Sequence, residues 1–128
     1  MATWNLTEMN HHVLICNGSS CMRKGGEEVT LAIRSEIKKR NLEVQVHTSR
    51  TRCNGRCKDA CVVVVYPEGT WYHEVDEPLA ERIVSEHLEQ GKPVEEAVTY
   101  TYNGRGMELH NDRVIGVDLD KEKKKVKQ

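Results

Sequence analysis

Hydrophobic residues occur along the chain in short runs that predict strands. Residues 11–16 start with two histidines and become apolar, and residues 62–65 are four consecutive valines. Short apolar runs of this length, above all β-branched ones, are typical of buried strands. In residues 42–47 apolar and polar side chains alternate, which predicts a strand with one covered face. Residues 70–75 follow a Pro-Glu-Gly turn and predict a hairpin with 62–65.

Two further segments have the spacing of amphipathic helices. Val29, Ile33 and Ile37 recur every four residues after a pair of glycines, which predicts a helix that ends near residue 40. A second apolar stripe follows Pro78, a residue favoured in the first turn of a helix, and stops before Gly91. The chain therefore alternates strands and helices in its first part, as α/β proteins do.

The order of these elements predicts a thioredoxin-like α/β fold, β-α-β-β-β-α, over residues 11–96. Residues 1–10 are a polar leader without predicted structure. Residues 97–117 contain two apolar segments around Asn-Gly-Arg-Gly and predict a C-terminal hairpin extension. Residues 118–128 are rich in lysine and are expected to form a solvated, disordered tail.

Composition and charge exclude several classes of function. The 128 residues contain no phenylalanine, so the predicted core is aliphatic and rests on valine. A formal charge of −1 gives no basic field for general nucleic-acid binding. The longest apolar run, residues 61–66, is too short to cross a membrane, and residues 1–12 lack the pattern of a secretory signal. We expect a cytoplasmic protein without nucleic-acid or membrane partners.

Four of the five cysteines form two pairs in loops. Four residues separate Cys16 from Cys21, and three separate Cys53 from Cys57. An odd number of cysteines in a reducing compartment argues against structural disulfides. One loop follows the first predicted strand and the other precedes the valine strand, so they can meet at one end of the sheet. Four thiolates would repel one another there unless a metal neutralised them, so convergence and metal binding form one hypothesis.

The cysteine spacing leaves three kinds of site open. Zinc is commonly held by four cysteines, although its ligand pairs are often only two residues apart. An iron-sulfur cluster is larger and tolerates wider, uneven loops. A thiol-based redox protein would use a reactive Cys53 or Cys57 beside arginines that lower its pKa, but the chain has no C-x-x-C pair.

Longer segments resemble the thioredoxin-like [2Fe-2S] ferredoxins between residues 11 and 93. The segments are Cys16-x4-Cys21, Gly-Gly-Glu-Glu-Val at 25–29, Cys-Asn-Gly-Arg-Cys-Lys-Asp-Ala at 53–60, and residues 62–72. In the last segment the four valines are followed by Tyr-Pro, then by a glycine and by Trp-Tyr. The resemblance implies a one-electron carrier, not an enzyme, with a [2Fe-2S] cluster bound by Cys16, Cys21, Cys53 and Cys57. It also implies a redox partner protein and a homodimer. A likeness to the small CbiW-type ferredoxins suggests cobalamin biosynthesis.

The chain departs from the family where members often carry proline before the valine run, because Cys61 stands there. The C-x3-C spacing thus occurs twice. We favour Cys53 and Cys57 as ligands, since Cys61 opens an apolar strand and should point into the core.

Residues around the cysteines suit an anionic centre. The N–H groups of Gly18 and Gly55 and the hydroxyls of Ser19 and Ser20 are candidate donors to sulfur. Basic residues near the cysteines suggest a docking surface for an acidic redox partner. The six histidines have no metal-ligand spacing and are expected at the surface or partly packed. The basic residues are Arg23, Lys24, Arg50, Arg52, Arg56 and Lys58.

Overall fold

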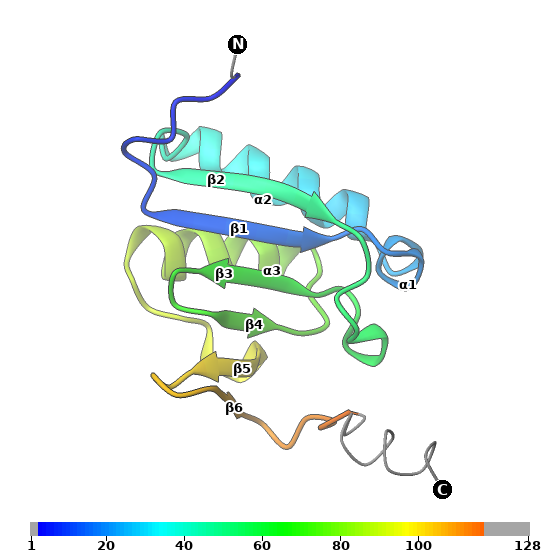
Figure 1. Cartoon of the computed structure of the whole chain (residues 1–128). Helices are drawn as coiled ribbons and strands as arrows, with labels where there is room; N and C mark the ends of the chain where they lie inside the picture. The colour runs from blue at the N-terminus through cyan, green and yellow to red at the C-terminus, as the bar shows by residue number, and fades with distance from the viewer. Residues whose placement is uncertain (1–2, 117–128) are drawn as a thin grey trace, which may run out of the picture.

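The computed structural model describes residues 3–116 and contains one six-stranded sheet with helices on one of its faces (Figure 1). The strand order is β2-β1-β3-β4-β5-β6. β1 and β2 are parallel, and every other neighbouring pair is antiparallel. The strands are β1 (His11–Cys16), β2 (Val46–Thr51), β3 (Val63–Tyr66), β4 (Thr70–Tyr72), β5 (Val98–Tyr102) and β6 (Met107–Leu109).

Two long helical segments cover the sheet, as the apolar stripes predict. Val29, Ile33 and Ile37 are buried on one side of α2. α3 begins at a capped end, where the Asp76 side chain accepts a hydrogen bond of 2.9 Å from the Leu79 N–H. None of the helices within residues 3–116 is long and apolar enough to cross a bilayer. The helical segments are α1 (Ser19–Arg23), α2 (Gly26–Lys39), the 3-10 helix Cys57–Asp59, α3 (Glu77–Arg82), the π-helix Ile83–Glu89 that continues it, and the 3-10 helix Glu95–Ala97.

The predicted α/β class is confirmed, but the second strand lies four residues later than the alternating pattern of 42–47 predicts. Leu42 closes the end of α2, because its N–H donates to the Ile37 carbonyl at 2.9 Å. The strand begins at Val46, which is in register with His11. β2 is an edge strand, so polar Thr, Ser and Arg side chains can face solvent along it. The alternation of apolar and polar residues in 42–47 could not show which segment pairs with β1. In the structure the more polar residues Val46–Thr51 form that strand.

Two smaller differences lie near the ends of strands. α1 follows β1 where the sequence predicts only a turn. β6 stops at Leu109, earlier than the predicted segment 107–117, because Asn111 and Asp112 adopt positive φ angles of 56° and 50° that end strand pairing. The lysine-rich tail expected at 118–128 lies outside the described residues.

His87 is fully buried, so the expectation of surface or partly packed histidines is wrong at this position. Its Nδ1 lies 2.7 Å from the Tyr72 hydroxyl, whose oxygen also accepts the Val94 N–H at 3.1 Å. The hydroxyl proton is therefore donated to Nδ1, and the His87 Nε2–H is donated to Glu68 Oε2 at 2.7 Å. His11 Nε2 lies 2.9 Å from the same oxygen. These groups form a hydrogen-bonded network that runs from the buried Tyr72 and His87 to the exposed Glu68, and in it Nε2 of His87 carries a proton and is not free to ligate a metal.

Burial lowers the pKa of His87, so the folded protein keeps this ring neutral at pH values where the unfolded chain protonates it. Stability then falls as the pH drops below about 6.5, by at most about 1.4 kcal/mol per pH unit for one group. We expect the free energy of urea unfolding to fall less steeply with decreasing pH in His87→Gln than in the wild type. His12 and His73, whose pKa values are also lowered by burial, act equally in both proteins. Equal slopes would contradict the assignment.

Candidate metal centre

The two cysteine pairs lie at the same end of the sheet and line one cavity. Cys16 is the last residue of β1 and Cys21 lies in α1. Because β1 and β2 are parallel, their carboxyl ends coincide, with Cys16 in register with Thr51. Cys53 follows two residues later, and Cys57 begins the short helix before β3. The predicted convergence of the two loops is thus present in the fold.

Gly18 is where the two loops touch. A Cβ atom added to Gly18 would lie 2.8 Å from both the N and the Cα of Cys53, closer than real Cβ atoms come. The backbone of Gly18 is extended, with φ −64° and ψ 166°, so the requirement for glycine is steric and not conformational. Next to it, the Asn17 N–H donates to the Thr51 carbonyl at 2.7 Å and ties the loops together.

The four thiols divide into a buried pair and an exposed pair. Cys16 and Cys21 are each 3% exposed, whereas Cys53 and Cys57 face solvent with their Sγ atoms 3.4 Å apart. The Gly55 N–H donates to Cys53 Sγ at 3.3 Å, as expected. Within residues 3–116, no hydrogen bond to sulfur comes from Gly18 or from the two serine hydroxyls, although all three residues line the cavity.

Burial and hydrogen bonding move the pKa values of two of these thiols in opposite directions. Burial raises the pKa of Cys21 to about 12, which keeps it a thiol at neutral pH unless a positive charge compensates. The Gly55 N–H, followed by the Cys57 thiol, lowers the pKa of Cys53. A metal supplies the compensating charge, and a set of four sulfur donors fits zinc or an iron-sulfur cluster. The residues present therefore fit the predicted group.

Cys61 is buried beside the cavity but does not line it. Its Sγ lies 3.2 Å from the Cys21 carbonyl and 3.3 Å from the Lys24 carbonyl, and its thiol can donate to either. Burial raises the pKa of this thiol. Cys61 thus packs in the interior, in the orientation that its place at the start of an apolar strand predicts.

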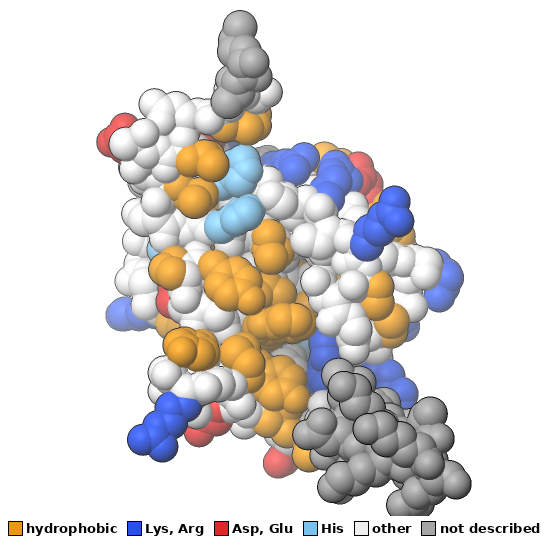
Figure 2. All heavy atoms as spheres, in the orientation of Figure 1, with side chains coloured by type: hydrophobic (Ala, Val, Ile, Leu, Met, Phe, Trp, Pro, Cys, Tyr) orange, Lys and Arg blue, Asp and Glu red, His pale blue; other side chains and the backbone are white. Residues whose placement is uncertain are grey.

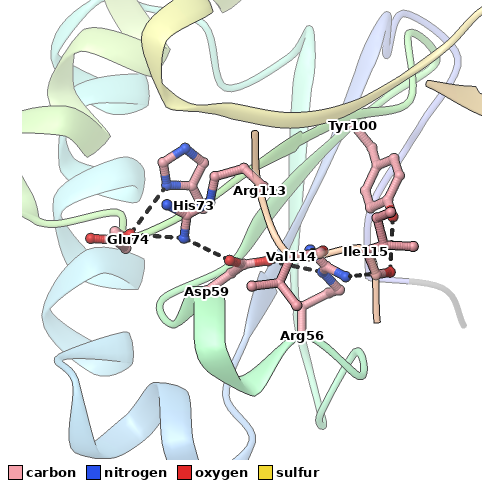
Figure 3. Close-up of polar contacts among 8 residues, drawn as sticks. All are labelled: Arg56, Asp59, His73, Glu74, Tyr100, Arg113, Val114 and Ile115. Atoms are coloured by element: carbon pink, nitrogen blue, oxygen red, sulfur yellow. Dashed lines mark hydrogen bonds and ion pairs between the residues drawn. The ribbon is translucent and has the colours of Figure 1, made fainter. Parts of the chain in front are cut away.

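Two of the six basic residues near the cysteines are neutralised by acidic partners. Arg50 pairs with Glu27, and Arg56 pairs with Asp59 at 2.8 Å. Asp59 lies two residues after Cys57, is buried and also binds Arg113 (Figure 3). The sequence did not single out Asp59 as a residue of this site. The sequence signal that could have pointed to Asp59 is its spacing of three residues from Arg56, which suits an ion pair. The remaining four are exposed and form no ion pair within residues 3–116: Arg23, Lys24, Arg52 and Lys58.

Comparisons with known proteins agree with this geometry. The family model "Thioredoxin-like [2Fe-2S] ferredoxin" matches residues 4–88. The chain is 54% identical over 120 residues to a putative 2Fe-2S ferredoxin of Priestia megaterium, covering 92% of this chain and 94% of that protein. It is 36% identical over 92 residues to the 2Fe-2S ferredoxin of Clostridium pasteurianum, covering 66% of this chain and 90% of that protein.

A solved structure has the same fold. The thioredoxin-like [2Fe-2S] ferredoxin from Aquifex aeolicus superposes with a TM-score of 0.69 and 31% sequence identity, covering 78% of this chain and 99% of that chain. The predicted thioredoxin-like fold is thereby confirmed. Together with the match over residues 4–88, these relationships establish that the chain belongs to the thioredoxin-like [2Fe-2S] ferredoxin family.

Proposed function

We propose that this ferredoxin holds its [2Fe-2S] cluster through Cys16, Cys21, Cys53 and Cys57. The observation that carries the proposal is the single cavity lined by these four thiols from two separate loops. These four thiols would hold the cluster, which would supply one-electron redox chemistry, while the protein positions and tunes it. The chain is an electron carrier and not an enzyme, as its family indicates.

The buried and exposed thiols have different parts in this assignment. Cys16 and Cys21 sit among apolar side chains and fix the inner side of the site. Cys53 and Cys57 lie at the surface, so the outer side of the site is where a partner protein can approach. The Gly55 N–H donates to sulfur on that side and stabilises negative charge there.

We propose that an acidic redox partner docks against the exposed cysteine loop. Arg52 and Lys58 flank this loop, and Lys24 follows the loop of the first cysteine pair. Because these side chains are exposed and have no acidic partner in the described part of the chain, their charge is available to steer the encounter. Such steering needs only a small interface, which suits a transient electron transfer.

We propose that a second copy of the chain covers the sheet face opposite the helices. Leu14, Val64 and Trp71 are directly opposite one another on this face, which shows a continuous hydrophobic area (Figure 2). Tyr66 and Tyr102 stand there 40% and 54% exposed. An apolar area of this kind marks an interface, and the near-neutral charge does not oppose self-association.

A link with cobalamin biosynthesis is a hypothesis that rests on the resemblance to CbiW-type ferredoxins. The relatives described above are named only as 2Fe-2S ferredoxins. We therefore assign the chain electron transfer and leave the pathway as a hypothesis.

Anaerobically purified protein is expected to contain about two iron atoms and two acid-labile sulfides per chain. Serine at any of the four proposed ligands should lower iron content and bleach the visible absorption. Cys61→Ser, the matched control, should keep both, because its thiol does not line the cavity. A colourless protein with one zinc ion would favour the zinc alternative, and loss of iron in Cys61→Ser but not in Cys53→Ser would overturn the ligand set.

Gly18→Ala should reduce the iron bound per chain, because the added methyl group forces the two cysteine loops apart. Overpacking of this type costs roughly 1–3 kcal/mol. Gly106→Ala is the control, since nothing lies within 4 Å of a Cβ added there and its φ is not positive. Equal iron contents in the two variants would show that the Gly18 contact does not set the loop distance.

Sedimentation velocity tests the dimer. The wild type should sediment as a dimer, and the double variant Tyr66→Asp/Tyr102→Asp as a monomer, because each carboxylate would be buried without a partner. Leu31→Asp changes an exposed apolar residue of α2 on the opposite side and should stay dimeric. A monomeric wild type would refute this interface.

A further inference from the structure

The C-terminal segment 113–116 returns to the loop that carries Cys53 and Cys57 (Figure 3). The Arg56 guanidinium donates to the carbonyls of Val114 and Ile115, the latter at 3.1 Å. This segment lies beyond residues 4–88, the part that matches the family model. The contact therefore joins the cysteine loop to residues outside the part of the chain that matches the family model.

A buried carboxylate joins the loop to the segment. The Asp59 side chain is 2% exposed and accepts hydrogen bonds from Arg56 at 2.8 Å and from Arg113 at 2.7 Å. Arg113 also pairs with Glu74 at 2.8 Å, next to the end of β4. A buried carboxylate between two guanidinium groups is stable only while both contacts persist, because an unpaired buried charge is costly.

Strand β5 supports the same contact from the side. The guanidinium of Arg56 lies 5.2 Å from the centre of the Tyr100 ring, and the Tyr100 hydroxyl donates to the Ile115 carbonyl at 3.2 Å. A cavity of about 440 Å³ lies between the loop and the segment and is lined by residues from both. Polar contacts through Arg56, and not close apolar packing, therefore hold the two together.

We propose that segment 113–116 is a clasp that keeps the Cys53–Cys57 loop closed and so slows loss of the cluster, with Arg56 as the positioning residue. This inference rests on the proposed role of Cys53 and Cys57 as ligands. Both thiols are exposed, and nothing lies within 4 Å of a Cβ added at Gly55 between them, so the middle of the loop has little packing that restrains it. Exposed segments with few buried contacts are the ones that open locally.

Substitution of Arg56 by lysine separates the clasp from a simple charge effect. Lysine keeps the positive charge near the cluster but lacks the fork that contacts two carbonyls and a carboxylate together. We expect both Arg56→Lys and Arg56→Gln to lose visible absorption faster than the wild type when a chelator is added. The expected increase is roughly tenfold, the effect of losing one charge-assisted hydrogen bond on an opening equilibrium.

Arg52→Lys is the matched control, because this exposed arginine is next to Cys53 and has no ion pair in the described part of the chain. Arg113→Gln is a second variant, which removes the ion pair between Arg113 and Asp59 and should also speed bleaching. If Arg56→Lys bleaches at the wild-type rate while Arg56→Gln is fast, charge alone explains the effect and the clasp is wrong.

Amide hydrogen exchange of the metal-free protein tests the clasp independently of the cysteine ligands. Arg56→Lys should raise exchange in residues 53–59 and in 113–116 together, and Arg52→Lys should raise neither. Unchanged exchange in Arg56→Lys would overturn the clasp even if the cluster binds as proposed. A wild type that binds no cluster would refute the proposed function, while coupled exchange of the two segments would still support the contact between them.

Discussion

The contact between Gly18 and the backbone of Cys53 sets the distance between the two cysteine loops. Parallel pairing of β1 with β2 brings the loops to the same end of the sheet, but a side chain at residue 18 would hold them apart. The four thiols share a cavity because the chain has hydrogen in place of a methyl group at this point. The absence of a side chain at Gly18 is therefore a steric requirement for bringing the four thiols together.

Two of the four cysteines are buried and two are exposed, so the two sides of the site differ in their chemical environment. The inner thiols are packed in the core, where burial raises the pKa of Cys21 and makes the charge of a metal necessary for ligation. The outer thiols are exposed, and the pKa of Cys53 is lowered by a backbone N–H. One side of the proposed centre is thereby anchored in the core, while the other faces solvent. An anchored inner side and an accessible outer side are what an electron carrier needs.

Two polar networks stabilise opposite ends of the sheet. His11, the first residue of β1, joins Glu68 and His87 in a hydrogen-bonded network, whereas Cys16, the last residue of the same strand, lies at the cysteine end. At that second end Asp59 links the loop of the outer cysteines to the C-terminal segment. Because the networks share no residue, changes in one are expected to leave the other intact.

The sequence by itself determined the main helix, the central strand and the family. The stripe of Val29, Ile33 and Ile37 defined α2, the valine run defined β3, and the cysteine spacing with its flanking residues identified the family. Local periodicity carries this information because side-chain direction repeats within each element.

Tertiary structure decided which segments pair and which polar groups become buried. The polar segment Val46–Thr51 forms an edge strand because β1 offers it parallel partners, although the alternation of 42–47 favours the preceding residues. Likewise, His87 is buried through Tyr72, and Asp59 through Arg113, partners that lie 15 and 54 residues away. Contacts between residues far apart in sequence leave no periodic signal, so these features follow only from the folded chain.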